Sequence, residues 1–206
     1  MPQTSIACRP KDSSEDDQAS YSIHLLGLFR VEYAGREITP PPGIQARTIK
    51  LLALHGGSMH REHLAELLWP GQDRCLGQTR LRNVLTRLRP RIGALLGRRG
   101  ENIAFVAPYT LDTQHFLATS AEAIRQTHHD PHAALAAGRQ ALDAYRGHLL
   151  IEDRYDDDIE DARQRFARRL VTLLDALADA AQTSDIPHEA ALYRGSASDA
   201  RIDVLA

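Results

Sequence analysis

Short strand-like segments follow a polar stretch at the start of the chain. Residues 1–20 are rich in Ser, Asp and Gln, and we expect them to form a disordered leader. From Tyr21 onward, β-branched and aromatic residues form two short segments and a shorter third, with a turn at Ala34-Gly35 before the third. The prolines at positions 40–42 end this pattern. The sequence therefore predicts a small antiparallel sheet.

Two helices are predicted after the prolines. The segment that follows Gly43 has an apolar side and stops at Gly56-Gly57, as a helix would. In the next segment, residues 58–69, Ser58 stands where an N-cap is expected, and Leu and Trp residues form a buried stripe. Pro70-Gly71 ends this second helix.

A third helix, from Arg74, has the clearest division between an apolar and a polar side. Residues at helical spacing form one buried stripe, namely Leu81, Val84, Leu85, Leu88 and Ile92. At about 100° per residue, the opposite side is polar and carries Thr79, Asn83 and Thr86, flanked by Arg80, Arg82, Arg87 and Arg91. Pro90 costs a helix interior about 3 kcal/mol, so we expect the helix to end or kink there.

The segments after the third helix predict a β-hairpin. Residues 97–112 read GRRGEN, IAFVA and PYTLD, and their candidate packing residues are Ile103, Phe105, Tyr109 and Leu111. Three helices with a sheet before them and a hairpin after them are the order of a winged helix-turn-helix. In that fold the third helix enters the major groove of DNA, while the wing and helix N-termini hold phosphates.

The remainder of the chain reads as successive amphipathic helices with short polar links, at residues 112–126, 131–147, 158–182 and 186–196. Alanines at close-packing positions favour antiparallel helical hairpins of the tetratricopeptide (TPR-like) kind, and a plain helical bundle is the alternative. Either arrangement is typical of a protein-binding or regulatory module. The predicted fold class is thus mainly α with small β: residues 21–111 form the winged helix and residues 112–206 the helical domain.

Composition agrees with a helical protein of one large or two small domains. The 206 residues are 43% hydrophobic and only 5% aromatic. The two cysteines, Cys8 and Cys75, are far apart and form no CxxC pattern, which fits a reducing, cytoplasmic location. No run approaches 18 apolar residues and the N-terminus is polar, so we expect neither a membrane span nor a signal peptide.

The charge is divided between the two parts. Residues 21–111 carry a net charge of +7 and residues 112–206 a net charge of −7, although the whole chain is only −2. Eight arginines and no Asp or Glu lie between Arg74 and Arg99. A face of one sign suggests a polyanion as partner, since ordinary helix surfaces mix signs. Arg, Asn and Thr are also side chains that reach base edges in a major groove.

Taken together, these segments resemble the Streptomyces antibiotic regulatory protein (SARP) family, which joins an OmpR/PhoB-type winged helix to a bacterial transcriptional activator domain. The resembling segments are IHLLGLFRVEYAGREI, HLAELLWPG, TRLRNVLTRLR, APYTLDTQHF and ALDAYRGHLL, in this order. The family's activator domain normally extends beyond the length present here, so the helical domain is expected to be incomplete.

The resemblance implies a sequence-specific transcriptional activator that binds direct repeats in double-stranded DNA near promoters and recruits RNA polymerase. It places a set of residues at the major groove, Thr79, Arg80, Arg82, Asn83, Thr86 and Arg87, with Tyr109 near the wing tip. Arg98 and Arg99 are the wing's phosphate-binding candidates. The turn between the second and third helices is the implied polymerase contact and consists of Pro70, Gly71, Gln72 and Asp73. The helical domain would mediate homodimerisation or effector coupling.

Other chemistry has weaker support. His60 and His63, and the cluster of His128, His129 and His132 with Asp130, lack the spacing of a zinc site, so we expect structural or solvated roles and no metal or cofactor. The acidic run 153–161 lacks the glycine of a calcium loop. We interpret it as a solvated helix start, with an acidic docking surface for a basic partner as the alternative.

No Gly-rich phosphate loop or catalytic triad is present in the sequence, so we do not expect an enzyme. The hypothesis is therefore a DNA-binding activator. Its rival is a helical-repeat interaction adaptor whose winged helix no longer reads DNA, a possibility that Pro90 and the short helical domain raise. Burial of Arg82, Asn83 and Arg87 under the helical domain would favour that rival or an autoinhibited regulator.

Overall fold

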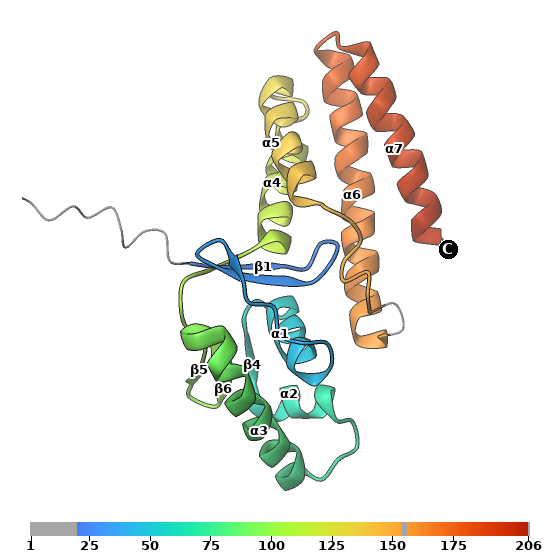
Figure 1. Ribbon diagram of the computed structural model, residues 1–206. Coiled ribbons are helices and arrows are strands. Elements are labelled where there is room, and N and C mark those ends of the chain that lie inside the picture. Colours follow the sequence, from blue (N-terminus) through green and yellow to red (C-terminus); the bar gives the residue numbers. More distant parts are fainter. Residues whose placement is uncertain (1–19, 154–155, 206) are drawn as a thin grey trace, which may run out of the picture.

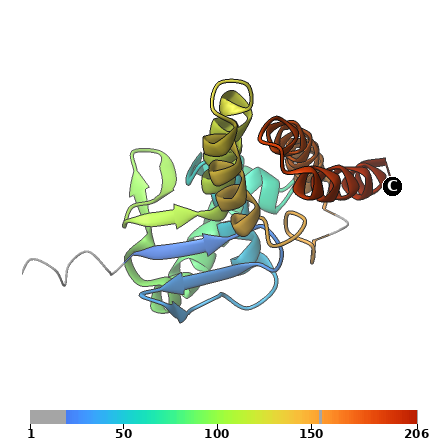
Figure 2. The same cartoon turned by 90° about the horizontal axis from the view of Figure 1, so that it is seen from above.

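The computed structural model describes residues 20–153 and 156–205. The expected leader at residues 1–20 lies outside this range, except for Ser20. In Figure 1 a small sheet crosses the middle of the molecule, residues 44–105 lie below it and the helices of residues 112–144 stand above it. The helices of residues 157–205 lie to one side, and the first of them runs down past the level of the sheet. The view from above in Figure 2 shows the strands of the first sheet side by side, with the helices of residues 112–144 over one edge and those of residues 157–205 beside the sheet.

The first sheet has four strands in the order β3-β2-β1-β7. The three antiparallel strands that the sequence predicts are β1 (Tyr21–His24), β2 (Arg30–Tyr33) and β3 (Arg36–Glu37). The fourth, β7 (Tyr109–Leu111), runs parallel to β1, with Tyr21 opposite Tyr109. Ile23 and Val31 alternate with exposed or half-buried residues and bury one face of the sheet.

The first two predicted helices are present, but the start of the second differs from the prediction. They are α1 (Ile44–Leu54) and α2 (Arg61–Leu68). Ser58 is not an N-cap, because residues Ser58–His60 form strand β4 and pair with a strand of the wing. The N-cap of α2 is His60, whose side chain accepts from Glu62 N–H at 3.4 Å.

The third helix, α3 (Arg74–Ile92), begins at an N-cap formed by Asp73, which accepts from Cys75 N–H and Leu76 N–H at 2.9 and 3.1 Å. Pro90 lies in its last turn, and the helix stops two residues later, as expected for a proline near a helix end. Gly93 then takes a positive φ of 51° and opens a short 3-10 turn.

A β-hairpin follows this turn. It consists of β5 (Leu96–Arg99) and β6 (Asn102–Phe105), and β4 adds to it as a third strand. The prediction that residues 109–112 continue this hairpin is wrong, because β7 pairs with β1 of the first sheet instead. The strand that β7 pairs with is set by hydrogen bonds to a segment far away in the sequence. The local pattern of residues 108–112 does not encode that partner.

Four helices complete the chain and form two hairpins. Their bounds are α4 (Asp112–Gln126), α5 (Pro131–Ala144), α6 (Asp157–Thr183) and α7 (Pro187–Leu205). Figure 1 shows α4 beside α5 and α6 beside α7, which the contacts between consecutive helices confirm. Gly138 of α5 lies so close to the Leu177 side chain of α6 that a β-carbon there would overlap it, so α5 and α6 pack closely at this point.

The two parts of the molecule are joined around β1. Leu150 N–H donates to Leu25 O at 2.8 Å, and Leu149 and Leu150 are fully buried there. One continuous hydrophobic core runs through both parts. The predicted fold class, a winged helix-turn-helix followed by antiparallel helical hairpins, is confirmed.

Candidate nucleic-acid interface

The outer face of α3 carries the side chains predicted to read DNA. Leu81, Val84, Leu88 and Ile92 are buried, and Leu85 is half-buried, so the predicted stripe fixes the rotation of the helix. The six predicted major-groove residues are all exposed, namely Thr79, Arg80, Arg82, Asn83, Thr86 and Arg87. None of these six is covered by the helices α4–α7 within the described part of the chain.

The two threonines on this face have their hydroxyl protons already engaged. Thr79 Oγ1 donates to Cys75 O at 2.9 Å, and Thr86 Oγ1 donates to Arg82 O at 2.9 Å. A hydroxyl donates only one hydrogen bond but has two acceptor lone pairs. In this conformation both threonines therefore offer a ligand an acceptor and a methyl group, while Asn83 and the arginines supply the donors.

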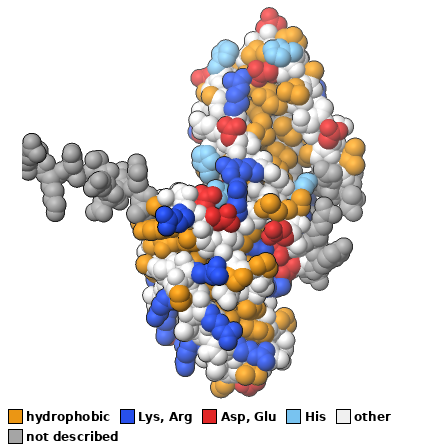
Figure 3. Space-filling view, viewed as in Figure 1, with side chains coloured by type: hydrophobic (Ala, Val, Ile, Leu, Met, Phe, Trp, Pro, Cys, Tyr) orange, Lys and Arg blue, Asp and Glu red, His pale blue; other side chains and the backbone are white. Residues whose placement is uncertain are grey.

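The arginines of α3 have few acidic neighbours. Arg74, in the first turn, is ion-paired with Glu62 of α2. Among the described residues, no carboxylate lies within ion-pairing distance of Arg80, Arg82, Arg87, Arg89 or Arg91. In Figure 3 the charged side chains at the lower end of the molecule, where α2 and α3 lie, are mostly blue, with few red ones. The positive field on this face is therefore available to a ligand.

The wing carries charge of both signs. Arg98 and Arg99 are exposed on β5, as predicted. Glu101, in the turn of the hairpin, pairs with Arg61 of α2 at 2.7 Å and lies 3.9 Å from Arg98. This carboxylate stands just beyond the acid-free stretch of the sequence. It fixes the wing against α2 and offsets part of its positive charge.

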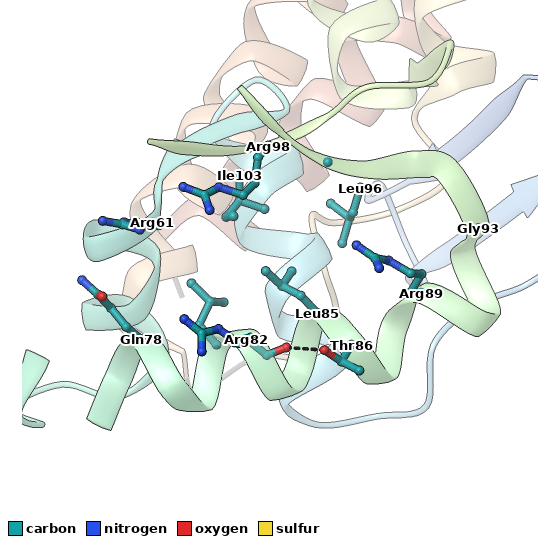
Figure 4. Close-up of a pocket in the computed structure, with 12 residues that line it drawn as sticks. Arg61, Gln78, Arg82, Leu85, Thr86, Arg89, Gly93, Leu96, Arg98 and Ile103 are labelled. Carbon is teal, nitrogen blue, oxygen red and sulfur yellow. Dashed lines mark hydrogen bonds between the residues drawn. The ribbon is translucent and has the colours of Figure 1, made fainter. Parts of the chain in front are cut away.

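A groove separates α3 from the wing, with a cavity volume of about 230 Å³. Figure 4 shows Leu85 of α3 and Leu96 of β5 on its apolar walls, with Arg82, Arg89 and Arg98 around it. The sequence pattern did not identify Arg61, Gln78 or Arg89 as site residues. Arg89 could have been found, because it lies seven residues after Arg82 and therefore on the same side of the helix.

Tyr109 is not near the wing tip, where it was predicted. It starts β7 in the first sheet, its ring lies 5.0 Å from that of Phe105, and its hydroxyl donates to Gly56 O at 3.3 Å. The wing tip is the turn at Gly100 and Glu101. Since Tyr109 is held between the two sheets, we do not retain it among the candidate DNA contacts.

The turn predicted to contact polymerase is exposed at Pro70, Gly71, Gln72 and Asp73. Gly71 has a positive φ of 70°, and its N–H donates to Glu66 Oε1 at 3.1 Å. Asp73 caps α3, so its side chain already has a structural role. Pro70 and Gln72 are the positions of this turn whose side chains offer a surface to a partner.

The helical part is held to the winged helix by an acidic residue at the start of α4. The Asp112 side chain, 8% exposed, accepts from Leu25 N–H and Leu26 N–H at 2.8 to 2.9 Å. Burial raises the pKa of this carboxyl, while those hydrogen bonds and the nearby His24 oppose the shift. These hydrogen bonds join the first residue of the helical part to the segment that directly follows β1.

The acidic run forms a second contact between the two parts. Asp156 caps α6, in agreement with the predicted helix start. Arg47 of α1 pairs with Asp156 at 2.6 Å and with Asp158 at 2.8 Å, and Lys50 pairs with Asp153 at 2.6 Å. The basic partner considered in the sequence analysis is therefore α1 of the same chain.

Two further features of the described residues bear on alternative functions. Within residues 20–153 and 156–205, no group of three His, Cys, Asp or Glu side chains is arranged to hold a metal ion. Asp130, from the histidine cluster, caps α5 by accepting from Ala133 N–H at 3.0 Å. No helix of the described chain is both long and apolar enough to span a bilayer.

Comparisons with known proteins agree with this architecture. Residues 111–199 match the family described as bacterial transcriptional activator domain. A structure of Mycobacterium tuberculosis EmbR in complex with a low-affinity phosphopeptide matches with a TM-score of 0.58 and 16% identity, over 89% of this chain and 58% of the EmbR chain. At that identity the match shows the fold alone, and this chain spans little more than half of EmbR. No curated protein matches the sequence.

These findings define a class of protein, a winged helix joined to activator-type helical hairpins. They confirm the resemblance to SARP-type transcriptional regulators, through the domain match over residues 111–199 and the fold of the chain. The activator-domain match supports a regulator of the transcriptional activator type, a class that is generally not enzymatic.

Proposed function

We propose that this protein is a sequence-specific DNA-binding transcriptional activator. In this proposal residues 21–111 are the DNA-binding domain and residues 112–206 the activator-type domain, and the protein acts in the cytoplasm. The observation that carries the proposal is the outer face of α3, where exposed Arg, Asn and Thr residues lie opposite a stripe of buried and half-buried apolar residues. Among the described residues, the arginines of α3 other than Arg74 have no acidic partner.

In the proposed mechanism, different residues provide non-specific affinity for DNA and recognition of its sequence. Arg98 and Arg99 of the wing, with Arg80 and Arg87 of α3, bind backbone phosphates and supply affinity that does not depend on sequence. Arg82 and Asn83, near the middle of the helix, reach base edges, where a bidentate Arg contact selects guanine and a bidentate Asn contact selects adenine. Asn83 carries no charge, so its contribution is to specificity.

The primary test is duplex binding by fluorescence anisotropy across a salt series, with DNA from upstream of the protein's own gene and a shuffled control. We expect log K to fall with log salt with a slope of about −0.9 per phosphate contact, and the upstream DNA to bind more tightly. A steep salt dependence with equal affinity for the two duplexes would indicate a protein that binds DNA without sequence specificity. No binding at low salt would contradict the proposal and favour an interaction adaptor.

Recruitment of RNA polymerase is assigned to the turn between α2 and α3. Gln72 is the residue to test, because it is exposed and, unlike Asp73, does not cap α3. We expect Gln72→Ala to lower transcription from a responsive promoter in vitro while DNA affinity stays unchanged. An equal loss of both would contradict a polymerase contact at this turn.

Dimerisation on a direct repeat is the third part of the proposal, and the helical hairpins are the candidate surface. A duplex with two half-sites is expected to bind two copies with positive cooperativity, measured by analytical ultracentrifugation on labelled DNA. Deletion of one half-site would then lower affinity for the remaining site. Independent binding to the two sites would contradict a dimer on DNA.

A further inference from the structure

The side of α3 that faces the wing differs chemically from the side that faces outward. Gln78, Arg82, Leu85 and Arg89 follow one another at spacings of four, three and four residues and form one wall of the groove. The opposite wall belongs to β5 and β6, with Leu96, Arg98 and Ile103. Figure 4 shows these side chains converging on a common space.

The floor of this groove is apolar. Leu81 and Ile103 are buried, and Leu85 and Leu96 are half-buried where they meet the cavity. A DNA phosphate strand requires hydrogen-bond donors and positive charge, but it does not require an apolar floor. Half-exposed leucines gain free energy from a ligand that removes their remaining apolar surface from water.

The rim of the groove is cationic. Four arginines line it, Arg61, Arg82, Arg89 and Arg98. Glu101 is the acidic partner of Arg61 and lies near Arg98, whereas Arg82 and Arg89 have no ion-pair partner among the described residues. A guanidinium binds a planar carboxylate through two parallel hydrogen bonds. Arg82 and Arg89 lie on one side of α3 with Leu85 between them. A single ligand could therefore contact both arginines through an anionic group and Leu85 through an apolar body.

We propose that this groove is a binding site for a small organic anion with a flat or branched apolar body, such as an aromatic carboxylate. The cavity of about 230 Å³ is smaller than the roughly 300–1,000 Å³ of drug-sized sites, which fits a ligand of one or two rings. The carboxylate binds Arg89 and Arg82, and the rings cover Leu85 and Leu96. Because Arg82 is also a base-reading residue, the ligand inhibits DNA binding, and this regulatory part rests on the proposed function.

Binding is tested directly with 1-naphthoate and its uncharged analogue 1-naphthamide. The full chain is labelled with carbon-13 at leucine methyl groups and titrated with each compound. We expect naphthoate to shift the methyl signals of Leu81, Leu85 and Leu96, and to bind at least tenfold more tightly than naphthamide. The signal of Leu192, exposed on α7, is the control and stays in place. Equal affinities, or shifts confined to other leucines, would overturn the site.

Two arginine variants test the rim. Arg89→Gln removes one of the two unpaired charges from the groove, and we expect it to weaken naphthoate binding about five- to tenfold. Arg91→Gln is the matched control, because Arg91 is exposed on the same helix but does not line the groove. Both positions are exposed, so neither change removes core packing. Similar affinities for the two variants would contradict the assignment of Arg89.

Competition with DNA tests the regulatory part. With naphthoate at ten times its dissociation constant, mutually exclusive binding weakens DNA affinity about elevenfold, by the factor 1 + [L]/Kd. Unchanged DNA affinity at that concentration would overturn the inhibition. If the protein binds no DNA, the methyl shifts alone still decide whether the ligand site exists, so failure of the proposed function and failure of the site remain distinct.

Discussion

The arginines of the two parts of the molecule have different surroundings. In the helical part, Arg139 pairs with Glu189 at 2.9 Å and Arg201 with Asp175 at 2.5 Å, and Arg163 pairs with Glu160 one turn earlier. On α3, the five arginines that follow Arg74 lack such partners among the described residues, namely Arg80, Arg82, Arg87, Arg89 and Arg91. The same kind of side chain forms ion pairs within the helical part, whereas on α3 beyond Arg74 it remains without an acidic partner in the part of the chain that the structure describes.

The boundary between these two uses lies at α1. Arg47 and Lys50 belong to the basic part, but they pair with the acidic run of the helical part. Lys50 is the more buried of the two, with its side chain 7% exposed and its ammonium 5.0 Å from the centre of the Phe29 ring. Arg47 and Lys50 thus join the two halves of opposite net charge, whereas most of the other positive side chains of the basic half lie on α3 and the wing.

The largest effect is expected at the contact between α1 and the acidic run. Asp153→Asn leaves Lys50 buried, and its remaining ion-pair partner among the described residues is Glu152, at 3.7 Å. Breaking a buried pair costs about 3–5 kcal/mol. Asp153 is 28% exposed, so we expect the free energy of unfolding to fall by about 2–3 kcal/mol in urea titrations. Arg82→Gln, on the unpaired face, is the control and changes it by less than about 0.5 kcal/mol. An equal loss of unfolding free energy in both variants would contradict the view that paired charges stabilise the fold and unpaired charges do not.

The next effect concerns what the α3 face reads. Asn83→Ala is expected to cost about 1–3 kcal/mol on the upstream duplex and little on shuffled DNA, because an uncharged amide adds nothing to non-specific affinity. Arg98→Ala weakens binding to both duplexes alike. Anisotropy titrations at one fixed salt concentration compare the two variants. Equal losses on both duplexes for Asn83→Ala would refute its base-reading role.

Glu101 provides a test with the opposite sign. This carboxylate pairs with Arg61 and lies near Arg98 in the wing, so it repels DNA phosphates. Glu101→Gln removes the repulsion, and we expect about two- to fivefold tighter binding to any duplex, equivalent to roughly 0.4–1 kcal/mol. Weaker binding of this variant would mean that fixing the wing against α2 matters more than the charge.

A smaller effect separates arginines that contact phosphates from those that stabilise the fold. Arg99→Ala is expected to make the salt slope of DNA binding less steep by about 0.9, since one phosphate contact is lost. Arg201→Ala, in the helical part, leaves the slope unchanged and lowers the free energy of unfolding by about 0.2–1 kcal/mol, as an exposed pair does. A change in the salt slope for Arg201→Ala would indicate that the helical part also contacts DNA phosphates.

The smallest effect is a pH dependence at Asp112. Burial raises the pKa of this carboxyl above its unfolded value of about 3.9. Its titration therefore contributes stability that is present below that value and is lost as the pH rises through the folded pKa. We expect the difference in unfolding free energy between the wild type and Asp112→Asn to decline from pH 3.5 to 6.5. A flat difference across this range would contradict the raised pKa.

Much of the candidate site on α3 was predictable because it depends on residues close together in the sequence. The spacing of Leu81, Val84 and Leu88 fixes which side of α3 is buried, and the exposure of Asn83 follows from it. Two predictions failed where a residue's environment came from elsewhere. Ser58 looks like a helix cap, but it belongs to a strand that pairs with β6. Tyr109 follows the wing in sequence, but it pairs with Tyr21 in the other sheet.

The sequence by itself determined the helices, the first three strands and the wing hairpin, the position of the one-sign face and the division of charge between the halves. These properties depend on the type and spacing of residues along the chain, and not on how separate elements pack. Only the tertiary structure decided which charged side chains form ion pairs within the protein. Lys50 meets Asp153 across 103 residues and Arg47 meets Asp156 across 109. It also formed the groove between α3 and the wing, because a cavity depends on how separate elements pack, and no local pattern encodes that packing.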